Sequence, residues 1–153
     1  GEWTMYDTSV AVGDIRHRDR ARQIISFSNL RRHRGITPTD IDGFIDYGGN
    51  GFILMEAKIY KKEIEYGQKI AFENLTKSIN KKPICTVVFR HDTPSEEDIQ
   101  ADECYVDDYY ANFKWGSMKL PKLQWHRLLD QQIKLLDFIE RVENFWKSKG
   151  CIL

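Results

Sequence analysis

Charged side chains stand at the open ends of a segment that is otherwise an apolar hairpin. The first apolar arm opens with Asp40 and Asp42, and the second closes with Glu56 and Lys58. Side chains alternate across a strand, so Asp40 and Asp42 share a face, as do Glu56 and Lys58 on the other arm. Pairing of the two arms around the glycine-rich turn at 48–51 therefore brings these ionisable groups together.

Two explanations account for charge in this position, since burying an unpaired charge costs several kcal/mol. In the structural explanation, Lys58 bridges the carboxylates. In the chemical explanation, an aspartate, Glu56 and the backbone carbonyl of Ala57 hold a hard divalent cation, which prefers oxygen ligands. Such a cation lowers the pKa of a bound water and neutralises charge on a pentavalent phosphate. Lys58 would then orient or deprotonate the water, or stabilise the developing negative charge. The second explanation predicts phosphodiester hydrolysis.

Several regular elements are expected to position these groups. Two strands, over 41–47 and 52–60, form the hairpin, because both are rich in β-formers and the glycines between them allow positive φ angles. Apolar residues at helical spacing predict a basic amphipathic helix over about 19–34, a second helix over about 66–79, and a long C-terminal helix over about 123–148. A continuous apolar run at 83–90 indicates a strand inside a covered sheet, and a further strand is expected between 104 and 116.

Length and composition favour one domain over 1–153, in which a core spans about 14–116. Apolar residues make up 41% and charged residues 30%, which is ordinary globular usage. Three widely spaced cysteines without a CxxC pair argue against a disulfide framework or a zinc site and favour a reducing cytoplasm. No apolar run approaches the roughly 20 residues that span a bilayer, so we expect neither a membrane partner nor a secretory route.

Charge is unevenly distributed, although the formal net charge is zero. Seven arginines and two aspartates lie between Asp14 and Arg34, whereas eight acidic residues and no Lys or Arg lie between Asp92 and Tyr110. The first segment could face phosphates, and the second would repel them. Solvated surface is the plainer explanation for both.

The pattern "DIDGFID" followed by "FILMEAK" resembles the PD-(D/E)XK nuclease superfamily, in which an Asp and a (D/E)-x-K occupy adjacent strands. The resemblance covers about residues 14–90. It implies an α/β fold with a restriction-endonuclease-like core, a central mixed β-sheet flanked by helices, to which the long C-terminal helix is an addition. It also implies Mg²⁺ as the cofactor, with Mn²⁺ able to substitute, and no small organic cofactor.

The resemblance assigns roles to individual residues. Asp42 and Glu56 would be metal ligands together with the Ala57 carbonyl, and Lys58 would stabilise charge or act as the base. Gln68, in "EYGQ", matches a Gln that several branches carry after the lysine strand and would help to position the water or a phosphate. The implied nucleic-acid contacts are basic residues just before and within the first helix, and one in the second: Arg16, Arg18, Arg20, Arg22 and Lys69.

The sequence departs from the family pattern in two places. No Pro directly precedes the aspartate, and Asp40 and Asp42 both lie on the right face. Asp42 is the preferred ligand because the apolar strand follows it directly, as in many family members, and Asp40 is held in reserve. No glutamate lies between Asp14 and Arg34, where some branches place one.

The sequence therefore predicts a metal-dependent nuclease that hydrolyses DNA. A structure-directed or nonspecific endonuclease of phage or bacterial recombination or repair type is expected, with a homodimer formed through the C-terminal helix. The alternative is a non-catalytic nuclease-fold adaptor that regulates a partner or DNA ends, and a third interpretation is a plain interaction domain with a salt-bridged hairpin.

Overall fold

The computed structural model describes residues 23, 26–94, 97–112 and 123–153, in two compact units that divide after Pro38. The described part of the first unit contains only two single-turn 3₁₀ helices, Ser28–Leu30 and His33–Gly35. The helix expected to continue to Arg34 is therefore wrong over this part. Arg34 has a φ of 60°, and every residue from Arg31 to Pro38 is exposed, so no buried apolar face stabilises a helix there. Arg16, Arg18, Arg20 and Arg22 lie outside the described residues.

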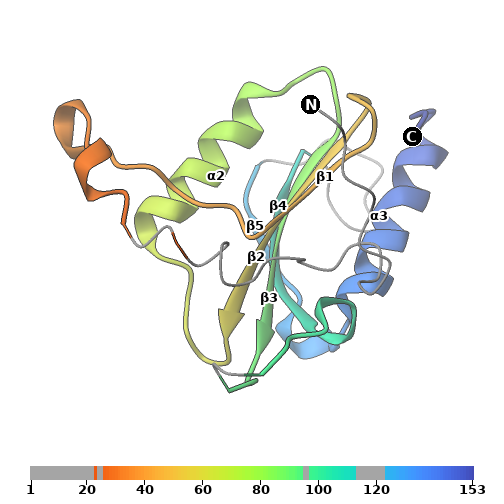
Figure 1. Cartoon of the computed structure of the whole chain (residues 1–153). Helices are drawn as coiled ribbons and strands as arrows, with labels where there is room; N and C mark the ends of the chain where they lie inside the picture. Colours follow the sequence, from red (N-terminus) through yellow and green to blue (C-terminus); the bar gives the residue numbers. More distant parts are fainter. Residues whose placement is uncertain (1–22, 24–25, 95–96, 113–122) are drawn as a thin grey trace, which may run out of the picture. The chain divides into compact units, whose positions relative to one another are not determined.

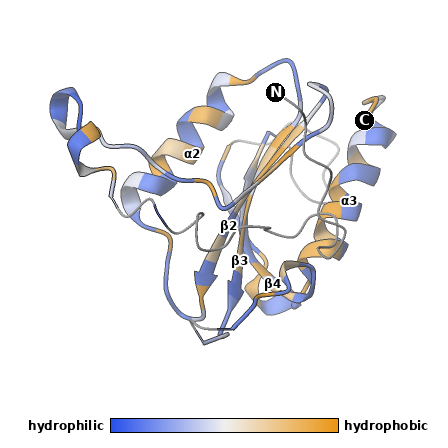
Figure 2. Cartoon of the chain, viewed as in Figure 1, coloured by the Kyte–Doolittle hydropathy of each residue, from blue (hydrophilic) through white to orange (hydrophobic). Residues whose placement is uncertain are grey.

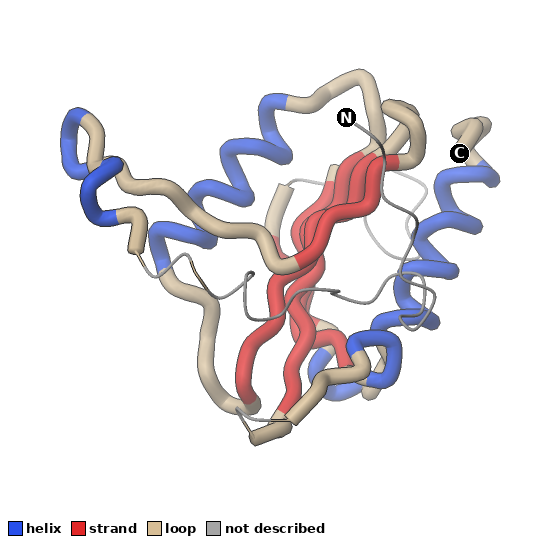
Figure 3. Tube along the Cα trace, viewed as in Figure 1, coloured by secondary structure: helices blue, strands red, loops and turns tan. Residues whose placement is uncertain are grey.

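The second unit confirms a mixed α/β class (Figure 1). Its five-stranded sheet has the order β1-β2-β3-β4-β5, and only β2 and β3 are parallel. The strands are β1 (Gly43–Asp46), β2 (Phe52–Ile59), β3 (Ile84–His91), β4 (Tyr105–Ala111) and β5 (Trp125–Arg127). Helix α2 (Tyr66–Ser78) connects β2 to β3, and α3 (Leu135–Ser148) ends the chain after two 3₁₀ turns, Ala101–Glu103 and Leu129–Gln131. Figure 3 shows the strands as one layer between these two helices.

The two faces of the sheet bury different apolar clusters. Leu54 and Ile84 pack with Phe72 of α2, whereas Ile53 and Val87 belong to the larger cluster that includes α3. Alternation along β2 therefore sends even-numbered side chains toward α2 and odd-numbered ones toward α3. Figure 2 shows β2 and β3 apolar through the middle of the sheet and hydrophilic at their carboxyl ends.

The predicted hairpin is confirmed, with a shorter first strand. Gly48 and Gly49 both have positive φ angles, 63° and 80°, and the Gly49 N–H donates to Asp46 Oδ1 at 2.7 Å. The ladder begins at Gly43, which pairs with Met55. The strand predicted between 104 and 116 ends at Ala111, and residues 113–122 lie outside the described part.

The C-terminal helix begins at Leu135, so the predicted start at 123 is wrong. Trp125 instead belongs to β5, where its ring packs on Tyr110 at 5.3 Å between centroids and its Nε1–H donates to Glu73 of α2. Gln132 then adopts a left-handed φ of 49°, which interrupts the helical period. The apolar face of α3 therefore falls on different positions from those of the predicted helix: Leu135 is buried, whereas Leu136 is 46% exposed.

The cysteines and the helices can be compared with what the composition led us to expect. Cys85, Cys104 and Cys151 are free, and burial raises the pKa of the Cys85 thiol. Neither α2 nor α3, the α-helices of the described part, is long and apolar enough to cross a membrane.

Helix α3 offers a test of this packing. Phe138 is fully buried and packs on Tyr109, with ring centroids 5.4 Å apart. Phe138→Ala should lower the free energy of unfolding by about 3–5 kcal/mol, because it leaves a cavity between the helix and the sheet. Urea denaturation would measure the change. Leu136→Ala is the control and should cost less than about 1 kcal/mol; equal losses would contradict this position of the apolar face.

Candidate functional site

Asp42 lies where the hairpin ladder ends. Its Oδ2 accepts a hydrogen bond of 2.9 Å from the backbone N–H of Ala57. Asp42 is one residue before Gly43, and Ala57 is two residues after Met55, the partner of Gly43 in the last pair. A side-chain carboxylate thus takes the place that backbone pairing would fill if the strand continued. The bond holds Asp42 beside the β2 segment that carries Glu56 and Lys58.

Glu56 and Lys58 point toward the α2 side of the sheet, in phase with buried Leu54. Glu56 is only 4% exposed, and its Oε1 lies 3.1 Å from Lys58 Nζ. The other carboxylate oxygen, Oε2, is buried, and no group of the described residues completes a hydrogen bond to it. A charged oxygen in this state is costly, because burial removes its water and the nearby Gln68 side chain offsets only part of that cost.

The surroundings of Glu56 raise its pKa. Burial is the largest cause, and the nearby Asp42 carboxylate adds to it, while Lys58 and the Gln68 side chain oppose it. Gln68 lies in the first turn of α2 and acts here as a near neighbour of the carboxylate. The fold therefore brings together the four residues that the sequence predicted for catalysis: Asp42, Glu56, Lys58 and Gln68.

Backbone geometry places the Ala57 carbonyl on the same side as Asp42. The N–H of Ala57 points to the β1 side of β2, as its bond to Asp42 shows. In an extended strand the N–H and C=O of one residue point to the same side. Beyond Gly43 no β1 pairing covers this position, so the carbonyl faces the edge where Asp42 lies.

The available donors suit one kind of metal. In the described residues no group of three or more His, Cys, Asp and Glu side chains is arranged to hold an ion. The site offers instead two carboxylates and one backbone oxygen. Mg²⁺ keeps several waters and binds through one or two carboxylates, so this small oxygen set fits Mg²⁺ better than a metal that needs an all-protein cage. The unpartnered Glu56 Oε2 is the atom that such an ion would satisfy.

The remaining predicted residues lie around this centre. Asp40 is exposed in the segment before β1. Lys69 follows Gln68 on α2, and its Nζ lies 5.6 Å from the centre of the Trp125 ring.

Sequence reasoning missed Arg90, an arginine that lies beside the site. Arg90 pairs with Lys58 in the parallel register, forms an ion pair with Asp107, and lies over the rings of Tyr60 and Tyr105. A β-bulge allows this arrangement, because Val88 pairs with Asp108 while Phe89 pairs with Val106, leaving Asp107 as an extra residue. The parallel register of β2 and β3 would have placed Arg90 beside Lys58, but the bulge has no local sequence signal.

The bulge also changes how the acidic segment 92–110 is interpreted. Asp107 pairs with Arg90, and the Asp108 carboxylate lies 3.5 Å from Arg127 Nε. These two carboxylates are therefore neutralised within the sheet. The charge pattern of 92–110 had suggested an unpaired negative surface that repels phosphate, and these two residues do not present one.

Comparison with protein-family models, curated proteins and solved structures finds no significant match to this chain.

Replacing Glu56 tests the electrostatics of the site. Glu56→Gln should raise the free energy of unfolding at pH 7, by on the order of 1 kcal/mol, because the folded environment favours the neutral form. Its amide oxygen can still accept from Lys58. The folded pKa is raised, so the wild-type penalty is absent below the unfolded pKa near 4.5 and grows as pH rises through the folded pKa. Urea denaturation across this window should show the gain vanish at acid pH; a gain that does not depend on pH would contradict the assignment.

Proposed function

We propose that this protein is a Mg²⁺-dependent nuclease that hydrolyses phosphodiester bonds in DNA. The observation that carries the proposal is the convergence of Asp42, Glu56, Lys58 and Gln68 around a buried carboxylate oxygen that no described group satisfies. A purely structural ion pair would not need this oxygen to stay unpartnered. Lys58 also contacts Glu56 while Asp42 is held by the backbone, so the lysine is not required as a bridge between the two carboxylates.

The topology around the site supports a restriction-endonuclease-like core. A hairpin carries Asp42 before one strand and Glu56 and Lys58 on the next, and α2 then leads into the parallel strand β3. The PD-(D/E)XK superfamily that the sequence resembles has a core of a helix, a three-strand meander, a helix and a strand. The order seen here agrees with that core from the second strand of the meander onward. The parallel pair needs a crossover, which α2 provides while also contributing Gln68.

Each residue has a defined part in the proposed mechanism. Asp42, Glu56 and the Ala57 carbonyl would hold Mg²⁺, which supplies Lewis-acid stabilisation of the phosphate and a more acidic water when bound. Lys58, 14% exposed at its side chain, would orient the attacking water or stabilise the charge that develops on phosphate oxygen. Gln68 would position the water or a nonbridging oxygen through its amide.

The proposed setting follows the sequence expectations. A structure-directed or nonspecific endonuclease of recombination or repair, in the cytoplasm of a bacterial or phage-infected cell, fits a small chain with three free cysteines. Dimerisation through α3 stays a prediction. The apolar face of α3 packs on its own sheet through Leu135, Phe138, Val142 and Trp146, so a partner would have to use the opposite face.

A cleavage assay tests the proposal directly. The protein should be incubated with linear duplex, single-stranded, flapped and four-way-junction DNA in Mg²⁺, Mn²⁺ or EDTA. Cleavage is expected with either metal and not with EDTA, and Lys58→Ala or Glu56→Ala should lower the rate at least about 100-fold, as loss of one transition-state contact does. Absence of cleavage of every substrate in both metals, with wild type and variants alike, would reject catalysis.

A metal-binding experiment distinguishes whether Asp42 or Asp40 is the metal ligand. Mn²⁺ at about 100 times its dissociation constant should stabilise the wild type by about 2.7 kcal/mol, since it binds only the folded site. Asp42→Asn can keep the bond from Ala57 but should lose most of this stabilisation, whereas the matched variant Asp40→Asn should retain it. Thermal denaturation with and without Mn²⁺ provides the measurement. The reverse result would transfer the ligand role to Asp40.

The alternative is a non-catalytic adaptor that keeps the nuclease fold and binds DNA ends or a partner protein. In that case DNA binding would persist without cleavage, and Mn²⁺ would leave the thermal stability unchanged.

A further inference from the structure

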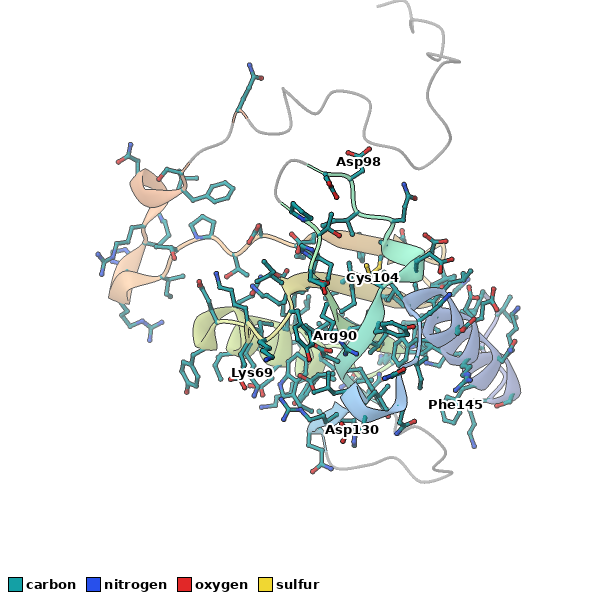
Figure 4. All side chains as sticks on the ribbon, turned by 90° about the horizontal axis from the view of Figure 1, so that it is seen from below. Lys69, Arg90, Asp98, Cys104, Asp130 and Phe145 are labelled. Carbon is teal, nitrogen blue, oxygen red and sulfur yellow. The ribbon has the colours of Figure 1, made fainter. Side chains whose placement is uncertain are left out.

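A cavity of about 370 Å³ lies on the α2 side of the sheet, next to the proposed catalytic residues. Its walls come from the segment after β2, from α2, and from the ends of β3, β4 and β5. Lys69 on α2 and Arg90 on β3 both line it, and Figure 4 shows their side chains near each other in the folded unit. The volume lies at the lower end of the range for small-ligand sites, which suits a single nucleotide.

The cavity is one strand away from the catalytic pair. Val88 and Arg90 line it, and in the parallel register they are the partners of Glu56 and Lys58. Adjacent strands lie about 4.8 Å apart, so a phosphate held at Lys58 and a group inside the cavity could belong to neighbouring units of one strand.

The lining carries excess positive charge, although the whole chain is neutral. Five basic residues face three acidic ones, Glu63, Asp107 and Asp108. Asp107 and Asp108 are already engaged by Arg90 and Arg127. The excess of two positive charges therefore comes from three lysines, Lys61, Lys62 and Lys69, set against Glu63. Lysine side chains are suited to phosphate oxygens.

The same cavity offers an aromatic surface. Tyr60 is 50% exposed, and the Arg90 guanidinium lies 5.9 Å from the centre of its ring. Asp107 holds Arg90 in place, whereas Lys61, 5.6 Å from the same ring, is an exposed flexible side chain that an incoming base can displace. Tyr and Arg planes stack on nucleobases without strong sequence preference.

We propose that this cavity binds one unpaired nucleotide of a nucleic-acid strand, with its phosphate on the lysines and its base against Tyr60. The volume suits one nucleotide, which would come from a single strand, a frayed end or a flap. The position of this nucleotide beside the scissile phosphate rests on the proposed function, but its binding does not. The inferred substrate class is DNA with an unpaired nucleotide next to the cleavage point.

Binding can be measured in EDTA, where no cleavage occurs, by fluorescence anisotropy of a labelled thymidine hexanucleotide. Lys61→Ala/Lys62→Ala should weaken binding roughly tenfold and lower the salt dependence by roughly 1.4 in log–log slope, as loss of two phosphate contacts on a single strand does. Lys81→Ala/Lys82→Ala removes the same charge from two exposed lysines outside the cavity lining and is the matched control. It should bind as the wild type does.

The base contact has its own test. Tyr60→Ala should weaken hexanucleotide binding about tenfold, whereas Tyr60→Phe, which keeps the ring, should bind normally. Melting temperatures of all variants identify any that fail to fold, and Tyr60→Phe keeps the stacking test informative if Tyr60→Ala is unstable.

Three results would overturn the inference: equal weakening by the two lysine pairs, binding of blunt duplex as tight as the hexanucleotide, or binding of free thymidine monophosphate as tight as the strand. Loss of binding in the cavity variants alone would uphold it even if the wild type cleaves no DNA, which would reject only the proposed function. Conversely, cleavage that depends on Lys58 but not on Tyr60, Lys61 or Lys62 would reject the cavity and keep the nuclease.

Discussion

The register of β2 is the constraint on which the rest of this structure depends. Its odd-numbered side chains enter the cluster beneath α3, and its even-numbered ones face α2. Because the side-chain period is two, a slip of one residue would drive Glu56 and Lys58 into the apolar cluster that contains Phe138. The glycine turn sets the register on one edge, and the parallel pairing with β3 sets it on the other.

That register places a carboxylate where it is poorly solvated. One oxygen of Glu56 lies on Lys58, and the other is buried without a completed hydrogen bond from the described residues. The apolar packing on both faces of the sheet must offset this cost. Proteins keep such unfavourable groups mainly where function needs them. Asp42 adds like charge nearby, which raises the pKa of Glu56 further.

The second consequence of the same geometry is the cavity next to Lys58. A parallel neighbour brings Arg90 into line with the lysine, and the bulge in β4 turns Asp107 toward that arginine. Glu56 and Lys58 therefore share one side of the sheet with Val88 and Arg90, which line the cavity. The carboxyl ends of parallel strands are where α/β folds commonly place ligands, and Lys58 and Arg90 both lie near the carboxyl ends of β2 and β3.

The sequence by itself determined the hairpin, α2, the apolar strand β3 and the grouping of Asp42, Glu56 and Lys58, because alternation, glycine turns and helical spacing are local signals. It could not determine where α3 begins, since the left-handed Gln132 and the packing of Trp125 between Tyr110 and Glu73 depend on distant partners. Only the tertiary structure decided that Glu56 Oε2 is buried without a completed hydrogen bond from the described residues, and that Arg90, Asp107 and Tyr60 meet. Such properties depend on how separate strands pair, and on how much water each side chain loses when they do.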